Sequence, residues 1–177
     1  MSVLSINSYA KAFLSADVPS SHPDQMLEKE WLLTNNRGSF AAGTLALCNT
    51  RRYHGLLVGS VRPPANRIMA LSTCQETIDV GSDQFNLTDF EFTGADYQPH
   101  NLKYLKHFRR DTGIHFDYNF DQLELTKSIY LLPDADVVAI VYDFIKLRAE
   151  VDFTVRPFVA LRDFHSLQKS DAAMQAQ

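Results

Sequence analysis

Apolar and polar residues alternate along most of the chain after residue 30, with the period of two that is typical of β-strands. Residues 114–120 place Ile, Phe, Tyr and Phe between His, Asp and Asn, which predicts a strand with one face in water. Residues 151–156 repeat this pattern. Residues 137–144 are almost continuously apolar and rich in β-branched side chains, so we expect a central strand there, buried on both faces.

Further strands are expected at residues 31–34, 40–48, 55–61, 68–80, 85–87, 103–110 and 123–131. Asp111, Thr112 and Gly113 form a predicted turn that joins residues 103–110 and 114–120 as a hairpin. No long helical periodicity interrupts the strands between residues 30 and 165. Many short strands without helices between them favour an all-β protein with two antiparallel sheets, a β-sandwich, rather than a βαβ fold.

Three segments follow from this pattern. Residues 1–27 are expected to be irregular or weakly helical, because residues 19–23 contain prolines and serines that interrupt regular structure. Residues 28–167 form the β-sandwich domain, and residues 168–177 are a polar tail or linker. Because the tail follows a run of strands directly, we expect the chain to be part of a longer protein.

Composition excludes several classes of function. The formal net charge of −4 gives no basic surface for nucleic acid, and no apolar run approaches the roughly 20 residues of a membrane span. Cys48 and Cys74 are the only cysteines, and their spacing matches no zinc or redox motif. We predict that both are buried and reduced, which indicates a cytoplasmic protein without a metal or other cofactor.

The most informative segment is a polar stretch between two apolar runs, residues 45–48 and 56–58. It contains Arg51, Arg52, Tyr53 and His54, and it ends at Gly55. Because buried strands flank it on both sides, its side chains are expected to be held in place. Guanidinium, phenol and imidazole groups suit an oxygen-rich or anionic ligand, but they equally suit the attachment of one part of a protein to another. An Arg–carboxylate cluster with a purely structural role is a third interpretation.

A second polar cluster lies at Arg162, Asp163 and His165. On a strand, Asp163 and His165 share a face, so the carboxylate is expected to hold the imidazole ring, or to belong to a plain ion-pair network. Trp31 is the only tryptophan and could fill the core or stack on a sugar; its apolar neighbours favour the core. No nucleophile elbow, phosphate-binding loop or zinc-ligand spacing is present, and catalytic carboxylates are not recognisable from spacing alone.

Three segments together resemble the N-terminal domain of bacterial and archaeal glycogen debranching enzymes, the amylo-α-1,6-glucosidase family. They are Glu30-Trp31-Leu32-Leu33-Thr34-Asn35, the block Asn49-Thr50-Arg51-Arg52-Tyr53-His54-Gly55-Leu56-Leu57-Val58, and Arg156-Pro157-Phe158 with Arg162-Asp163-Phe164-His165. The resemblance covers about residues 29–167. The chain departs from the family pattern at Asn36, Arg37 and Ser39.

The resemblance implies a supersandwich-like β-sandwich that precedes an (α/α) toroid, and the toroid carries the glucosidase chemistry. This chain alone is then expected to be inactive, to pack on the helical glucosidase domain and to help shape a site for α-glucan such as glycogen or limit dextrin. Residues 51–54 and 162, 163 and 165 are expected at the substrate or at the domain interface, with Trp31 and Gly55 in structural roles. The alternative is a stand-alone carbohydrate-binding or scaffolding module.

The resemblance also implies that more of the sandwich follows, so the sandwich is expected to be incomplete at its C-terminal end. An incomplete sandwich would leave a strand edge with unpaired backbone groups. We expect this edge at residues 151–159 or 161–165. Pairing with a second copy in a two-fold homodimer is the simplest way to cover it.

Overall fold

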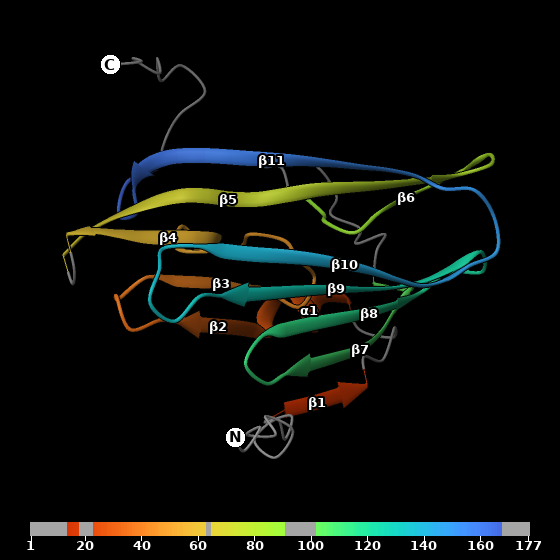
Figure 1. The fold of residues 1–177 in the computed structure, drawn as a ribbon, viewed down its shortest axis with the longest axis horizontal. Coiled ribbons are helices and arrows are strands. Elements are labelled where there is room, and N and C mark those ends of the chain that lie inside the picture. Colours follow the sequence, from red (N-terminus) through yellow and green to blue (C-terminus); the bar gives the residue numbers. More distant parts are fainter. Residues whose placement is uncertain (1–13, 18–22, 63–64, 91–101, 168–177) are drawn as a thin grey trace, which may run out of the picture.

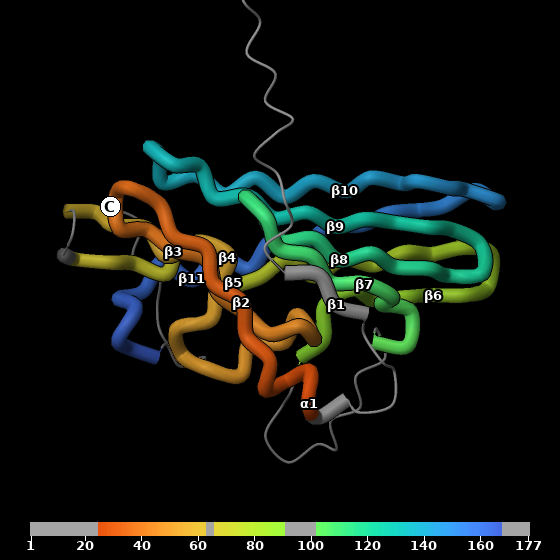
Figure 2. The backbone as a smooth tube through the Cα atoms, turned by 90° about the horizontal axis from the view of Figure 1, so that it is seen from below, coloured from red at the N-terminus to blue at the C-terminus, as the bar shows by residue number. Residues whose placement is uncertain are grey.

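The computed structural model describes residues 14–17, 23–62, 65–90 and 102–167, and these residues form two stacked antiparallel sheets (Figures 1 and 2). The first sheet has the order β1 (Leu14–Asp17), β7 (Leu105–Arg110), β8 (Ile114–Asn119), β9 (Leu123–Leu131) and β10 (Val138–Leu147). The second has the order β11 (Asp152–Asp163), β5 (Ala65–Val80), β4 (Gly55–Arg62), β3 (Phe40–Thr44) and β2 (Glu30–Thr34), and β6 (Asp83–Asn86) pairs with β5. Helix α1 (Pro23–Glu28) precedes β2. The β-sandwich prediction is therefore confirmed.

The core lies between the sheets and is built by the predicted alternation. Along β9, residues 123, 125, 127, 129 and 131 are buried, and Ile114 and Phe116 of β8 point to the same side with no exposed surface. The hairpin of β7 and β8 forms around residues 111–113 as expected. Both cysteines are buried and free.

A buried ion pair links the two sheets within this apolar core. Glu76 of β5 and Lys127 of β9 are 0% and 1% exposed, and Lys127 Nζ donates to Glu76 Oε1 at 2.6 Å. Tyr142 Oη donates to the same oxygen at 2.5 Å, and Thr88 Oγ1 donates to Oε2 at 2.6 Å. The carboxylate thus joins β5 of the second sheet to β9 and β10 of the first.

The structure corrects the expectation that residues 137–144 are a central strand. Strand β10 lies at the edge of the first sheet, and Val141 and Ile145 are exposed. Only its inner face is packed, through Tyr142 and Phe144, which contact the ring of Phe153. A run of apolar residues shows that burial would be favourable, but it does not supply the neighbouring strand that would cover the outer face and the edge.

Two other expectations change at element boundaries. The predicted strand 40–48 ends at Thr44, because residues 45–48 form a buried turn in which Leu47 has a φ of 54°. Thr44 Oγ1 donates to the carbonyl of Cys48 across this turn. Within the segment expected to be irregular or weakly helical, residues 14–17 form a strand and α1 forms a short helix; residues 1–13, 18–22 and the expected tail 168–177 lie outside the described residues.

The turn after β2 fastens the two sheets together. Asn35 Nδ2 donates to the carbonyls of Leu132 and Ala135 at 3.1 and 3.0 Å, in the turn between β9 and β10. From the same turn, Asp136 accepts hydrogen bonds from Arg37 and Ser39. Arg37 and Ser39 therefore take part in an inter-sheet contact.

Candidate functional site

Three sequence segments that lie far apart along the chain meet on the second sheet. They are Glu30 at the start of β2, the β3–β4 loop with residues 49–54, and residues 162–166 at the end of β11. In Figure 2 this loop and the end of β11 lie on the side of the second sheet that faces away from the first. We call the group formed by Glu30, the loop and residues 162–166 the motif cluster.

Glu30 anchors the first half of the loop. The Arg51 guanidinium donates to the Glu30 carboxylate, and this hydrogen bond holds the pKa of Glu30 below its usual range. The Arg51 side chain itself is largely exposed. An exposed ion pair of this kind contributes little to stability, so its main effect is to orient the guanidinium.

His54 lies in the interior with both ring nitrogens engaged. The backbone N–H of Thr50 donates to Nδ1 at 3.2 Å, and Nε2 lies 3.4 Å from Glu30 Oε1. Because Nδ1 accepts, the neutral ring carries its proton on Nε2 and points it toward the carboxylate. Burial lowers the pKa of His54, which favours this neutral form. His54 therefore closes the loop from inside.

Arg52 and Tyr53 connect the loop to the end of β11. Arg52 Nη1 donates to the carbonyl of His165 at 3.0 Å, and Tyr53 Oη lies 3.1 Å from His165 Nδ1. The Arg52 guanidinium also lies 5.8 Å from the centre of the Tyr53 ring, within the range of a cation–π contact. Tyr53 remains 39% exposed, so part of its ring is accessible.

Arg162 holds the two segments together through backbone carbonyls. Its guanidinium donates to Arg52 O at 2.8 Å and to Ser166 O at 2.6 Å, and it also reaches the carbonyls of Asp163 and Phe164. Partial burial lowers the pKa of Arg162. With its donors directed at the chain itself, Arg162 positions the motif cluster rather than presenting a free guanidinium.

The expected contact between the Asp163 carboxylate and the His165 ring is not formed. Asp163 Oδ1 instead accepts the backbone N–H of His165 at 2.8 Å, because the chain turns after β11 and the alternation of a strand no longer applies. The His165 ring faces Tyr53. Sequence reasoning missed this partner, since the two residues are separated by more than a hundred positions.

A row of rings continues from Tyr53 across the sheet. The Phe164 ring lies 5.5 Å from that of Tyr53 and 6.4 Å from that of Phe40, with the Arg67 guanidinium 5.8 Å from its centre. A shallow depression of about 370 Å³ adjoins this row. Its lining consists of Leu32, Thr34, Gly38, Ser39, Phe40 and Arg67. The surface therefore combines aromatic rings with guanidinium groups. The sequence motifs included Tyr53 and Phe164, but nothing in the sequence pointed to Phe40 or Arg67 as their neighbours.

Gly55 directly follows the loop, at a position where the structure has no room for a side chain. A Cβ at this position would lie 2.1 Å from Met69 Sδ and 3.2 Å from the carbonyl oxygen of Leu71. Gly55 therefore has the structural role expected from the sequence, and its physical cause is the close approach of Met69 and Leu71 on the neighbouring strand β5. Trp31 is likewise buried, as expected, and its indole N–H donates to the carbonyl of Thr44 at 3.1 Å.

Replacement of Gly55 by valine is expected to lower the free energy of unfolding by about 1–3 kcal/mol, because the added methyl groups overpack the core at Met69. Urea denaturation followed by circular dichroism measures the change. Gly59→Ala is the control, since its Cβ would meet only Asp136 Cβ, at 4.0 Å, and we expect a change within about 0.5 kcal/mol. Equal stability of Gly55→Val and the wild type would contradict the close approach.

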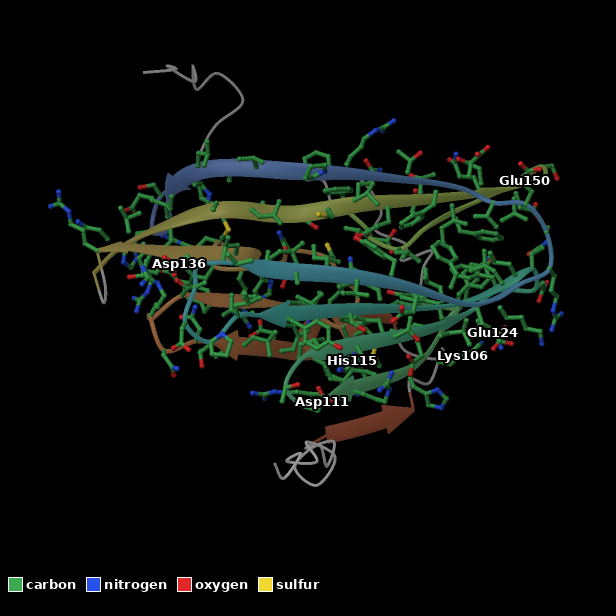
Figure 3. The ribbon with its side chains drawn as sticks, in the orientation of Figure 1. Lys106, Asp111, His115, Glu124, Asp136 and Glu150 are labelled. Carbon is green, nitrogen blue, oxygen red and sulfur yellow. The ribbon has the colours of Figure 1, made fainter. Side chains whose placement is uncertain are left out.

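One arrangement elsewhere superficially resembles a catalytic triad. Ser128 Oγ lies 2.9 Å from His115 Nδ1, and His115 Nε2 lies 2.9 Å from Asp111 Oδ1 (Figure 3 labels His115 and Asp111). Both Ser128 and His115 are buried, and the Tyr130 ring packs against the imidazole. With no access for a substrate to the hydroxyl, this group fastens the β7–β8 turn.

Within the described part of the chain, no three His, Cys, Asp or Glu side chains are arranged to hold a metal ion. Among these residues, no helix has the length and hydropathy of a membrane span. Neither curated proteins nor solved structures give a match to this sequence. A family model described as glycogen debranching enzyme N terminal matches residues 29–177.

Proposed function

Since this chain belongs to the family of glycogen debranching enzyme N-terminal domains, we propose that it is a non-catalytic β-sandwich that packs beside a helical glucosidase domain and helps bind α-glucan during glycogen breakdown. The family assignment rests on a match over most of the chain. We infer the role of the domain from its surface. Within that surface, we assign contact with glucan and with the helical domain to the motif cluster and its row of rings.

The convergence of Glu30, the loop and the end of β11 is the observation that carries this proposal. A purely structural cluster would not need an accessible ring, yet Tyr53 is exposed beside the exposed side chains of Arg52 and His165. Sugars present apolar ring faces surrounded by hydroxyl groups. An aromatic ring flanked by planar hydrogen-bond donors fits both features.

The test is calorimetric titration of the chain with maltoheptaose and with glycogen limit dextrin. We expect Tyr53→Ala to weaken binding by about tenfold, because loss of one stacking contact of about 1.4 kcal/mol corresponds to this factor. Val141→Ala removes an exposed apolar side chain from the first sheet and is the control, with no change expected. Equal affinity for glucan in wild type and Tyr53→Ala would contradict a sugar contact at this ring.

The helical glucosidase domain is the second partner in this proposal. Its contact with the motif cluster is measured separately, by sedimentation of the chain with that domain in the absence of sugar. If Tyr53→Ala weakens this association and leaves glucan affinity intact, the cluster is a domain interface. If only glucan affinity falls, the alternative of a carbohydrate-binding module is favoured, and the exposed ring of Tyr53 supports this alternative.

Two further expectations belong to the proposal. The free thiols of Cys48 and Cys74 support a reducing compartment such as the cytoplasm. Pairing of the isolated chain as a homodimer also stays a prediction; β11 does lie at a sheet edge, but Pro157 within it has no backbone N–H to offer a partner strand.

A further inference from the structure

The outer face of the first sheet contains a pocket of about 270 Å³, formed by residues of β7, β8, β9 and β10. Lys106 and Glu124, which both line it, lie close to each other in Figure 3. We call it the outer pocket. The motif cluster lies on the outer side of the second sheet, so the two regions occupy opposite faces of the sandwich.

Two β-bulges form opposite sides of the outer pocket. The pairing of β7 with β8 shifts between residues 105 and 107, and the pairing of β10 with β9 shifts between residues 144 and 146. The extra residues are Lys106 and Ile145, and both are exposed, Ile145 to 66%. Because a bulge re-aims side chains away from the regular alternation of a strand, these two side chains stand at the rim of the pocket.

Between the bulges, one pair of residues leaves the floor of the pocket open. Tyr118 of β8 and Leu125 of β9 are opposite each other, and both are buried in the core. Since their side chains point inward, only their backbone lies under the pocket. The neighbouring pairs on β8 and β9 point outward and close the remaining two sides, Asp117 with Thr126 and Asn119 with Glu124.

The Asp117 side of the pocket is held in a fixed position. Arg109 Nε and Nη2 donate to the two oxygens of Asp117, each at 3.0 Å. Thr126 Oγ1 donates to Asp117 Oδ1 at 2.8 Å. A side chain with three such hydrogen bonds loses little further freedom when a ligand binds beside it, which lowers the cost of binding.

The carboxylates of the pocket already have cationic partners within the protein. Asp117 forms an ion pair with Arg109, and Glu124 Oε1 lies 3.9 Å from Lys146 Nζ. A cationic ligand would have to compete with these partners. A neutral ligand with hydroxyl groups would not, because a paired carboxylate keeps further lone pairs that accept hydrogen bonds.

The other lining groups fit the same class of ligand. Lys106 and Asn119 are exposed and carry N–H donors, and the exposed side chain of Ile145 supplies an apolar wall. Sugar rings combine hydroxyl groups at their edge with an apolar C–H face. The volume lies just below the range of about 300–1,000 Å³ that is usual for small-molecule sites, so the pocket has room for one ring and not for a chain.

We propose that the outer pocket binds a single glucose unit and gives the domain a second contact with α-glucan. Only the identity of the sugar rests on the proposed function; the pocket itself shares no residue with the motif cluster. Contacts on opposite faces can hold two chains of one branched glucan. Such divalent binding raises the overall affinity for glycogen without a tighter contact at either face.

Titration of the isotope-labelled chain, followed by amide chemical shifts in NMR spectra, tests the proposal. The sugars are methyl α-glucoside, which presents one unit, and maltoheptaose. Amides of residues 117–119, 124–126 and 145 report on the outer pocket, and those of residues 51–54 report on the motif cluster. The titrations are repeated with Tyr53→Ala, in which the sugar contact proposed for the motif cluster is removed.

We expect both sugars to cause saturable shifts at the outer pocket, and we expect these shifts to persist in Tyr53→Ala. Ile145→Ala and Asn119→Ala should each weaken this binding by about fivefold. Val141→Ala is the matched control, because Val141 is an exposed side chain on the same face of β10, opposite Ser128 and outside the pocket. It should leave the affinity unchanged.

Shifts at residues 51–54 without saturable shifts at the outer pocket would overturn this inference and leave the proposed function standing. The inference would also fall if the pocket shifts disappear in Tyr53→Ala, if Ile145→Ala and Asn119→Ala bind like the wild type, or if only maltoheptaose causes them. Pocket shifts without any at residues 51–54 would support the outer pocket and contradict the sugar contact at Tyr53. Absence of shifts in both regions would contradict both.

Discussion

Replacement of Lys127 by methionine is expected to lower the free energy of unfolding by about 3–5 kcal/mol, since it leaves the Glu76 carboxylate buried without its cation. Tyr142 and Thr88 would still donate to this carboxylate, but two neutral donors do not replace an ammonium group at a site buried from solvent. Urea denaturation of the purified variants, followed by far-ultraviolet circular dichroism, measures the loss.

The double variant Lys127→Met/Glu76→Leu is the control for this ion pair. Because both charges are removed together, we expect it to be clearly more stable than the single variant, close to the wild type. A single variant within 1 kcal/mol of the wild type would show that the pair is not isolated from water in solution. A double variant as unstable as the single one would show that the unpaired charge is not the cause, and that the loss comes from packing or from the hydroxyl groups of Tyr142 and Thr88, which lose their acceptor.

Replacement of Trp31 by alanine is expected to destabilise the chain by about 3–5 kcal/mol. The indole is 4% exposed and fills the space beside Gly43, and its N–H satisfies the carbonyl of Thr44. Truncation would therefore leave a cavity and an unpaired acceptor close to the loop that builds the motif cluster. Circular dichroism is again the measurement, because the chain has no other tryptophan for fluorescence.

Leu32→Ala serves as the neighbouring control. Leu32 follows Trp31 on β2 but points outward and is exposed, so we expect a change below about 1 kcal/mol. Similar losses at both positions would mean that β2 is not packed on one face as described. If Trp31→Ala keeps the stability of the wild type, the indole is not part of the core, and the sugar-stacking interpretation becomes the better one.

Local patterns in the sequence were sufficient to predict most strands. The alternation in residues 114–120 and 123–131 predicted β8 and β9, because a strand with one buried face must repeat every two residues. The order Asp111-Thr112-Gly113 predicted their hairpin partner, β7. The resemblance of residues 30–35, 49–58 and 156–165 to one family was likewise readable from the sequence, and the family match confirms it.

The same patterns did not determine which strands are neighbours. Residues 137–144 are apolar enough for a central strand, yet β10 is an edge, since pairing depends on which other segment reaches it. The role of Lys127 was hidden for the same reason. Lys127 occupies one of the alternate positions of β9 that face the core. An inward-facing lysine is stable there only because Glu76 of the other sheet pairs with it.

For the motif cluster, the sequence by itself singled out two groups of side chains: residues 51–54, which lie between two apolar runs, and the second polar cluster at residues 162–165. Only the tertiary structure decided that they meet, that Glu30 joins them, and that His165 faces Tyr53 rather than Asp163. The physical reason is that a strand pattern encodes burial and direction over a few residues, whereas contacts across more than a hundred residues depend on how the strands pair and how the chain turns at their ends.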